Sequence, residues 1–133
     1  MARNLPKINE YLVAHKDAPF EWGVFDCCLM AADIVKLAGL GDPAEGVRGS
    51  YSTPSGARKV LKKHFDGLIE NAFSHLPEVD PAFAQRGDLI LYETSNGNVM
   101  AVKWVGGSYC ISPEDGMGVM IETDKPIKAW RVE

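Results

Sequence analysis

The chain has 133 residues, of which 46% are hydrophobic and 24% charged, and its formal net charge is −4. This length suits one domain with a real core and is short for two, so we expect a single domain over residues 1–133. The lack of long Lys/Arg runs argues against nucleic-acid binding, and the acidic balance argues against binding to anionic membranes. No apolar run is long enough to span a membrane.

The first half of the chain, about residues 1–76, is predicted to be helical. Asn4 and Asp26 are each a suitable N-cap before an apolar pattern of helical spacing, and Thr53-Pro54 is expected to start a third helix. The predicted helices cover about residues 5–15, 27–38, 54–65 and 68–74. The predicted helix at residues 27–38 has apolar residues around most of its circumference, which is typical of a buried central helix.

The second half, about residues 86–133, is predicted to form strands. These cover about residues 89–92, 99–105, 108–111, 116–121 and 127–132. Turn signals at Ser95-Asn96-Gly97-Asn98 and Gly106-Gly107 separate the first three, and we expect an antiparallel meander of about five strands. Helices followed by a sheet indicate the α+β fold class.

The stretch FEWGVFDCCLMAAD, residues 20–33, places two adjacent cysteines at the start of the second helix. Cys27 follows the cap, where the helix dipole and free backbone N–H groups favour a thiolate. Cys28 is turned by about 100° around the helix, so the two thiols cannot face the same surface. Both could instead be small buried hydrophobes, and the local sequence alone favours that alternative.

The cysteines and histidines do not form paired metal-ligand motifs, so we predict neither a metal site nor a cofactor. Arg86-Gly87-Asp88 and Glu114-Asp115-Gly116 are interpreted as turns. Arg48, in the glycine-rich loop, is expected to pair with Asp33 or Asp42 and to hold that loop over the central helix, although the loop could also line a cleft.

Several short motifs, taken in order, resemble the NlpC family of papain-like cell-wall cysteine peptidases, in a compact variant found among phage and prophage tail proteins. The motifs are Trp22-Gly23, Asp26-Cys27, Ala32-Asp33, Arg48-Gly49-Ser50-Tyr51, Gly87-Asp88-Leu89 and Ala129-Trp130-Arg131-Val132. The resemblance covers about residues 20–132 and implies a papain-like fold, in which a central cysteine-bearing helix packs on the C-terminal sheet.

The resemblance also implies a site. Cys27 falls on the nucleophile position, Asn98 on the position of the family histidine, and Cys110 near the third polar position. Phe20 falls near an aromatic position that is commonly Tyr in the peptidases. Asn cannot take up a proton near neutral pH, so this chain departs from the Cys-His mechanism. His15, His64 and His75 are expected at helix ends and not at the site.

Three hypotheses follow. In the first, the protein is a phage or prophage tail-tip or tail-assembly component that uses a degenerate peptidase fold as a structural module. It would be assembled in the bacterial cytoplasm, reside in the virion tail and bind other tail proteins. In the second, it is an active cysteine peptidase or amidase that cleaves peptidoglycan peptides during wall penetration. In the third, it is a bacterial protein unrelated to phages that binds a partner. The missing base favours the first.

Overall fold

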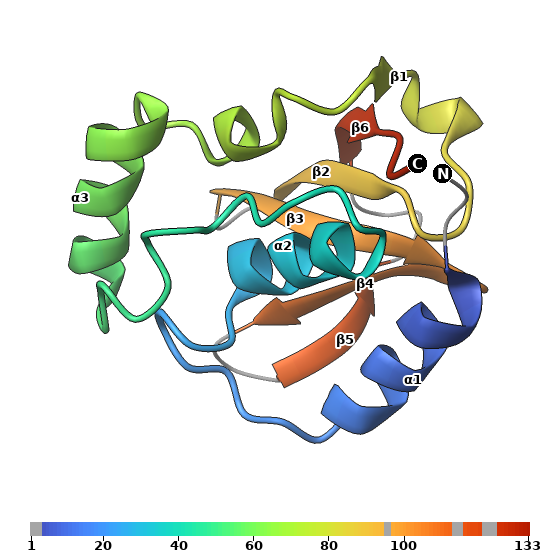
Figure 1. Cartoon of the computed structure of the whole chain (residues 1–133), viewed down its shortest axis with the longest axis horizontal. Coiled ribbons are helices and arrows are strands. Elements are labelled where there is room, and N and C mark those ends of the chain that lie inside the picture. The colour runs from blue at the N-terminus through green and yellow to red at the C-terminus, as the bar shows by residue number, and fades with distance from the viewer. Residues whose placement is uncertain (1–3, 95–96, 113–115, 121–124) are drawn as a thin grey trace.

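A computed structural model of the chain describes residues 4–94, 97–112, 116–120 and 125–133 and has an α+β architecture (Figure 1). The α-helices are α1 Leu5–His15, α2 Cys27–Leu37 and α3 Pro54–Phe65, and the 3-10 helices are η1 Ile69–Phe73 and η2 Pro81–Phe83. The strands are β1 Glu78–Val79, β2 Leu89–Thr94, β3 Gly97–Trp104, β4 Gly107–Ser112, β5 Gly116–Met120 and β6 Lys125–Trp130. The predicted order of helices before strands is confirmed.

The strands form one antiparallel sheet in the order β1-β6-β2-β3-β4-β5. Strands β2 to β5 follow one another as the predicted meander. The prediction is wrong for the last strand, because β6 returns to the other side of the sheet and pairs with β2. The two-residue β1 was not predicted, and it adds a sixth strand to the five longer ones. Residues 95 and 96 of the predicted turn and residues 114 and 115 lie outside the described residues.

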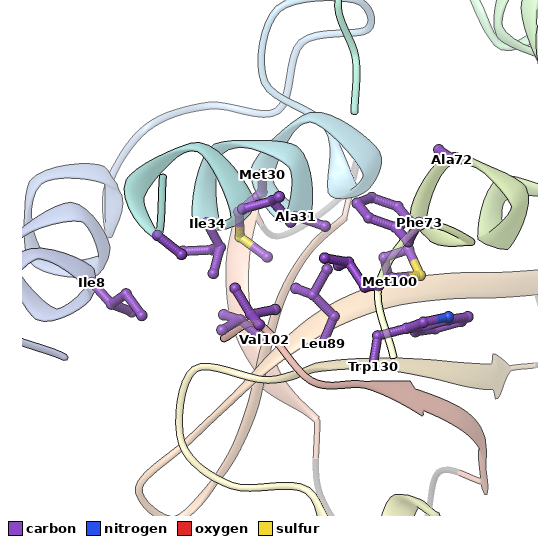
Figure 2. Close-up of a cluster of buried hydrophobic side chains, with 14 of the residues drawn as sticks. Ile8, Met30, Ala31, Ile34, Ala72, Phe73, Leu89, Met100, Val102 and Trp130 are labelled. Atoms are coloured by element: carbon purple, nitrogen blue, oxygen red, sulfur yellow. The ribbon is translucent and has the colours of Figure 1, made fainter. Parts of the chain in front are cut away.

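Helix α2 is the central helix that its apolar pattern predicts. Met30, Ala31 and Ile34 face the sheet, where they pack against Met100 and Val102 of β3 (Figure 2). The opposite side of α2 is covered as well, because its Leu29 and Ala32 pack beneath the following loop and α3. A helix enclosed on both sides holds its first residue, Cys27, in one fixed position.

The helix caps explain where the helices begin. Asn4 accepts a hydrogen bond from the backbone N–H of Lys7, and Thr53 accepts one from Gly56. Each cap satisfies a backbone donor that has no partner within the first turn of the helix. The predicted starts of α1 and α3 are therefore confirmed. In the part of the chain that the structure describes, each helix is too short or too polar to cross a lipid bilayer.

Asp88 ties the C-terminal segment to the sheet. Its side chain is 0% exposed and accepts hydrogen bonds from the backbone N–H groups of Gln85, at 2.8 Å, and Val132, at 3.0 Å. Its own backbone carbonyl accepts from Lys103 on β3. Asp88 thus joins segments that lie 44 residues apart in the chain, so the predicted turn at Arg86-Gly87-Asp88 is also an internal anchor.

Replacing Asp88 with Ala is expected to lower the free energy of unfolding by about 3 kcal/mol, because one buried and one partly buried N–H group lose their acceptor. Urea unfolding followed by circular dichroism measures the loss. Asp80→Ala is the control, since Asp80 caps η2 at an exposed position and its loss should cost about 1 kcal/mol or less. Equal losses in the two variants would contradict the anchoring role of Asp88.

Candidate functional site

Cys27 is the first residue of α2, directly after the cap Asp26, as predicted. Helix α2 lies across β3 and β4 (Figure 1). The cysteine packs at the margin of the main core. The backbone groups of Met100 on β3 and of Cys28 hydrogen-bond to its sulfur. The thiol therefore lies between the start of the helix and the middle of the sheet.

Burial raises the pKa of the Cys27 thiol to about 12. The two backbone hydrogen bonds favour the thiolate, but desolvation outweighs them, and the charges of Asp26 and Cys110 raise the pKa further. A cysteine nucleophile reacts as the thiolate. The activation that a helix N-terminus favours is thus outweighed by the apolar surroundings, in agreement with the alternative that the local sequence favours.

Cys28 is the second residue of α2 and is partly buried, like Cys27. Burial raises the pKa of its thiol as well, followed by the charges of Cys27 and Asp26, while Arg48 acts in the opposite direction. Cys28 packs against the main core. It therefore has the packing role expected for it.

Asn98 lies on β3 opposite Glu93 of β2, near the hairpin, and is exposed. It stands two residues from Met100, so its side chain projects from the same face of the sheet, the face that α2 covers. Asn98 thus lies on the face of the sheet that α2 covers, while the β3 group that hydrogen-bonds to the Cys27 sulfur is the backbone of Met100.

Cys110 lies on β4 and packs with Ile90, Tyr92 and Ala101 on the face of the sheet that points away from α2. Its neighbour Ile111 is the β4 residue that joins the main core on the α2 side. Cys110 is still close enough for its charge to affect Cys27. The structure thus brings Cys27 and Cys110 near each other but from opposite faces of the sheet.

The three histidines lie at helix ends, as predicted. His15 stacks on Tyr11, with ring centroids 4.1 Å apart, and its Nδ1 is 2.8 Å from the Tyr11 carbonyl oxygen. His64 is exposed beside Phe65 at the end of α3, and His75 is exposed after η1. Among the described groups that act on the Cys27 sulfur, none is an imidazole.

Arg48 makes both of the ion pairs that the sequence suggested as alternatives. Its guanidinium binds Asp42 through two hydrogen bonds of 3.0 Å, and its Nη2 lies 2.8 Å from Asp33 on α2. Asp33 also accepts a hydrogen bond of 2.6 Å from the Tyr11 hydroxyl on α1. Burial and this bond raise the pKa of Tyr11. The network holds α1, α2 and the loop together, which confirms the structural role expected for Arg48.

Replacing Arg48 with Met should lower the free energy of unfolding by about 1–2 kcal/mol at neutral pH, because two carboxylates lose a half-buried partner. The hydrogen bond from Arg48 holds the pKa of Asp42 below its usual value. A carboxyl with a depressed pKa adds stability above its unfolded pKa, about 4, and loses that contribution as the pH falls. The difference from wild type should therefore shrink below about pH 4.

Urea unfolding of both proteins at neutral pH and at about pH 3.5 measures this difference. Arg58→Met, on the exposed side of α3, is a matched control and should change stability by less than about 0.5 kcal/mol. A difference between wild type and Arg48→Met that does not change with pH would show that Arg48 stabilises through packing and not through its carboxylate partners.

A second set of polar contacts lies directly beside Cys27, and the sequence predicted its helix cap but not its contact with Tyr51. The Asp26 carboxylate accepts hydrogen bonds from the Leu29 N–H, the Gly23 N–H and the Tyr51 hydroxyl. Burial and the bond to Asp26 raise the pKa of Tyr51. Because Tyr51 lies 25 residues from Asp26, no local pattern predicts this contact. The one signal in the sequence is that Tyr51 belongs to the motif Arg48-Gly49-Ser50-Tyr51. These contacts fix the start of α2 and supply no free base.

Within the described residues there is no group of His, Cys, Asp and Glu side chains that could hold a metal ion. None of the curated proteins and none of the solved structures compared with the chain matches it. The model of one protein family, described as a domain of unknown function, DUF6950, matches residues 3–132. Because this match covers nearly the whole sequence, the chain belongs to the DUF6950 family.

Proposed function

We propose that the protein is a structural or interaction module of a phage or prophage tail, built on a degenerate papain-like fold of the NlpC type. One observation carries the proposal: Cys27 is the first residue of the central helix, its thiol is desolvated, and none of the described groups that shift its pKa is a histidine. The motif order described above supplies the connection to tail proteins.

The arrangement of the elements supports the fold part of the proposal. A buried helix with a cysteine as its first residue lies on an antiparallel sheet, and the strand expected to carry the family histidine passes beside it. Asn98 lies on that strand and on the side facing the helix. In the proposed arrangement Cys27 stands at the nucleophile position, and Asn98 stands where the resemblance expects the base.

The chemistry supports a non-catalytic role. A cysteine peptidase needs a thiolate to attack the amide carbonyl and an acid to protonate the leaving amine. With a pKa of about 12, the Cys27 thiol is almost entirely protonated near neutral pH. Asn98 can donate and accept hydrogen bonds but cannot transfer a proton. The polar contacts near the start of α2 join segments of the fold and involve Asp26, Tyr51 and Arg48.

Digestion of purified peptidoglycan tests the loss of catalysis. Wild type, Cys27→Ala and Cys28→Ala should release the same soluble products as buffer alone. The Cys28→Ala variant is the matched control, because it removes the neighbouring thiol without touching the nucleophile position. Products formed by wild type and Cys28→Ala but lost in Cys27→Ala would overturn the proposal in favour of an active peptidase or amidase.

Complementation of tail assembly tests the positive part. In the phage or prophage that encodes the protein, deletion of its gene should prevent formation of complete tails. Cys27→Ala should restore tails to the wild-type level, because the proposal requires the fold and not the thiol. Complete tails in the absence of the protein would contradict a structural role in the tail.

A further inference from the structure

Helix α3 has a basic face that the proposed fold does not use. It consists of Arg58, Lys59, Lys62 and Lys63, all exposed, and is called here the basic face of α3. The helix sequence, PSGARKVLKKHF, contains no acidic residue. Its other side packs through Val60 and Phe65 over α2 and the loop that follows α2. Figure 1 shows α3 at the edge of the molecule, where its outer side is free of other elements.

The helical geometry concentrates these four charges. At 3.6 residues per turn they fall within an arc of about 140°, and they span a rise of about 7.5 Å along the axis. Arg58 with Lys62, and Lys59 with Lys63, form like-charge pairs at a spacing of four residues, which destabilises a helix. The pattern therefore opposes the stability of the helix that carries it.

Two ordinary explanations account for only part of the pattern. Cations near a helix C-terminus are favoured by the helix dipole, which explains Lys62 and Lys63 but not Arg58 and Lys59 in the middle of α3. Ion pairing does not explain the pattern either, because within the described residues the ion pairs of the chain involve other cations. The basic face of α3 is thus a positive patch without ion-pair partners in the part of the chain that the structure describes.

The charge of the remaining chain makes this patch unusual. Of the 14 basic residues, four lie on this face, which leaves ten against 18 acidic residues and a net charge of −8 elsewhere. The patch is only about one and a half helical turns long, so a nucleic acid would also meet the negatively charged surface beyond it, whereas nucleic-acid sites have an extended basic surface. A short acidic segment fits the patch without reaching the acidic surroundings.

We propose that the basic face of α3 is a docking surface for an acidic segment of a partner protein. Leu68, three residues after the end of the helix, is 51% exposed and is an apolar side chain of the kind that protein interfaces use. Charge complementarity of this sort steers association and selects the partner more than it adds affinity. The inference names a surface and a partner chemistry for the proposed module, and it does not depend on whether Cys27 is catalytic.

Fluorescence anisotropy of a labelled Glu-rich peptide of ten residues, titrated with the intact protein, tests the inference. A labelled single-stranded DNA of ten nucleotides is the second probe. The test variant is Arg58→Gln/Lys59→Gln/Lys62→Gln/Lys63→Gln, which keeps good helix formers on α3. The control variant is Lys7→Gln/Lys16→Gln/Lys125→Gln/Lys128→Gln, which removes four exposed lysines elsewhere and has the same net charge of −8.

Wild type and the control should bind the peptide with similar Kd values that rise several-fold between about 50 and 200 mM NaCl, and the test variant should bind at least about tenfold more weakly. Absence of peptide binding by wild type, or equal weakening in both variants, would overturn the inference. Tighter binding of the DNA than of the peptide would overturn the choice of partner. If circular dichroism shows that the fourfold variant is unfolded, Arg58→Gln/Lys59→Gln decides in its place.

Because the readout is binding by the isolated protein, its failure is distinct from failure of the proposed function. Binding of the peptide together with digestion of peptidoglycan would support the docking surface and contradict the non-catalytic role. Absence of both would support the non-catalytic role and contradict the docking surface.

Discussion

Replacing Gly23 with Ala is expected to lower the free energy of unfolding by at least about 4 kcal/mol, one of the largest losses that a single substitution produces. Gly23 has φ = +79°, and a Cβ atom built at this position would lie 1.9 Å from the carbonyl oxygen of Tyr51. The left-handed conformation alone costs an Ala about 1–2 kcal/mol. The clash adds to this, since it involves backbone that a side-chain rotation cannot relieve.

The matched control for Gly23 is Gly46→Ala. Gly46 also has a positive φ, +84°, but a Cβ there would meet nothing within 4 Å. It therefore carries the conformational cost without the clash and should lose about 1 kcal/mol. Urea unfolding of both variants separates the two contributions, and equal losses would contradict the close packing of Tyr51 on Gly23.

Replacing Asp26 with Ala is expected to cost about 3–4 kcal/mol. The side chain is 2% exposed and accepts hydrogen bonds from Leu29, from Gly23 and from the Tyr51 hydroxyl. Its loss removes the helix cap and leaves buried donors without an acceptor. Because the start of α2 is then no longer fixed, the surroundings of Cys27 should loosen, and thiol reactivity should rise together with the loss of stability.

Two further variants isolate what Asp26 contributes. Thr53→Ala removes an exposed cap from α3 and should cost about 1 kcal/mol. Asp26→Asn keeps one acceptor oxygen but loses the charge and should fall between Thr53→Ala and Asp26→Ala. Thermal and urea unfolding of the three variants gives the ranking. A loss in Asp26→Ala no larger than in Thr53→Ala would show that the buried contacts add nothing to ordinary capping.

Local signals in the sequence predicted most of the elements. Asn4, Asp26 and Thr53-Pro54 predicted where the three α-helices begin. The apolar residues around most of the circumference of residues 27–38 predicted the central helix. These features depend on neighbours a few residues away. The path of β6 depends instead on pairing with β2, some 36 residues earlier in the chain, and no local pattern reports on such a partner.

The site was predicted less completely, for two physical reasons. A shift of one residue along a strand moves a side chain to the other face of a sheet, and this is why Cys110 packs away from α2 while Ile111 faces it. The contact of Tyr51 with Asp26 depends on how a loop folds back over α2. The desolvation of Cys27 likewise results from tertiary packing, which a helix N-terminus in the sequence does not show.

The most direct test of the central claim, that Cys27 is not a nucleophile, is the pH dependence of its alkylation. The measurement uses Cys28→Ala/Cys110→Ala, in which Cys27 is the only cysteine, and compares iodoacetamide rates in the folded protein and in urea. With a pKa of about 12, the folded protein should react about a thousandfold more slowly near pH 8 than the unfolded chain. A folded-state rate that exceeds the unfolded rate, with a midpoint below about pH 8, would contradict the account.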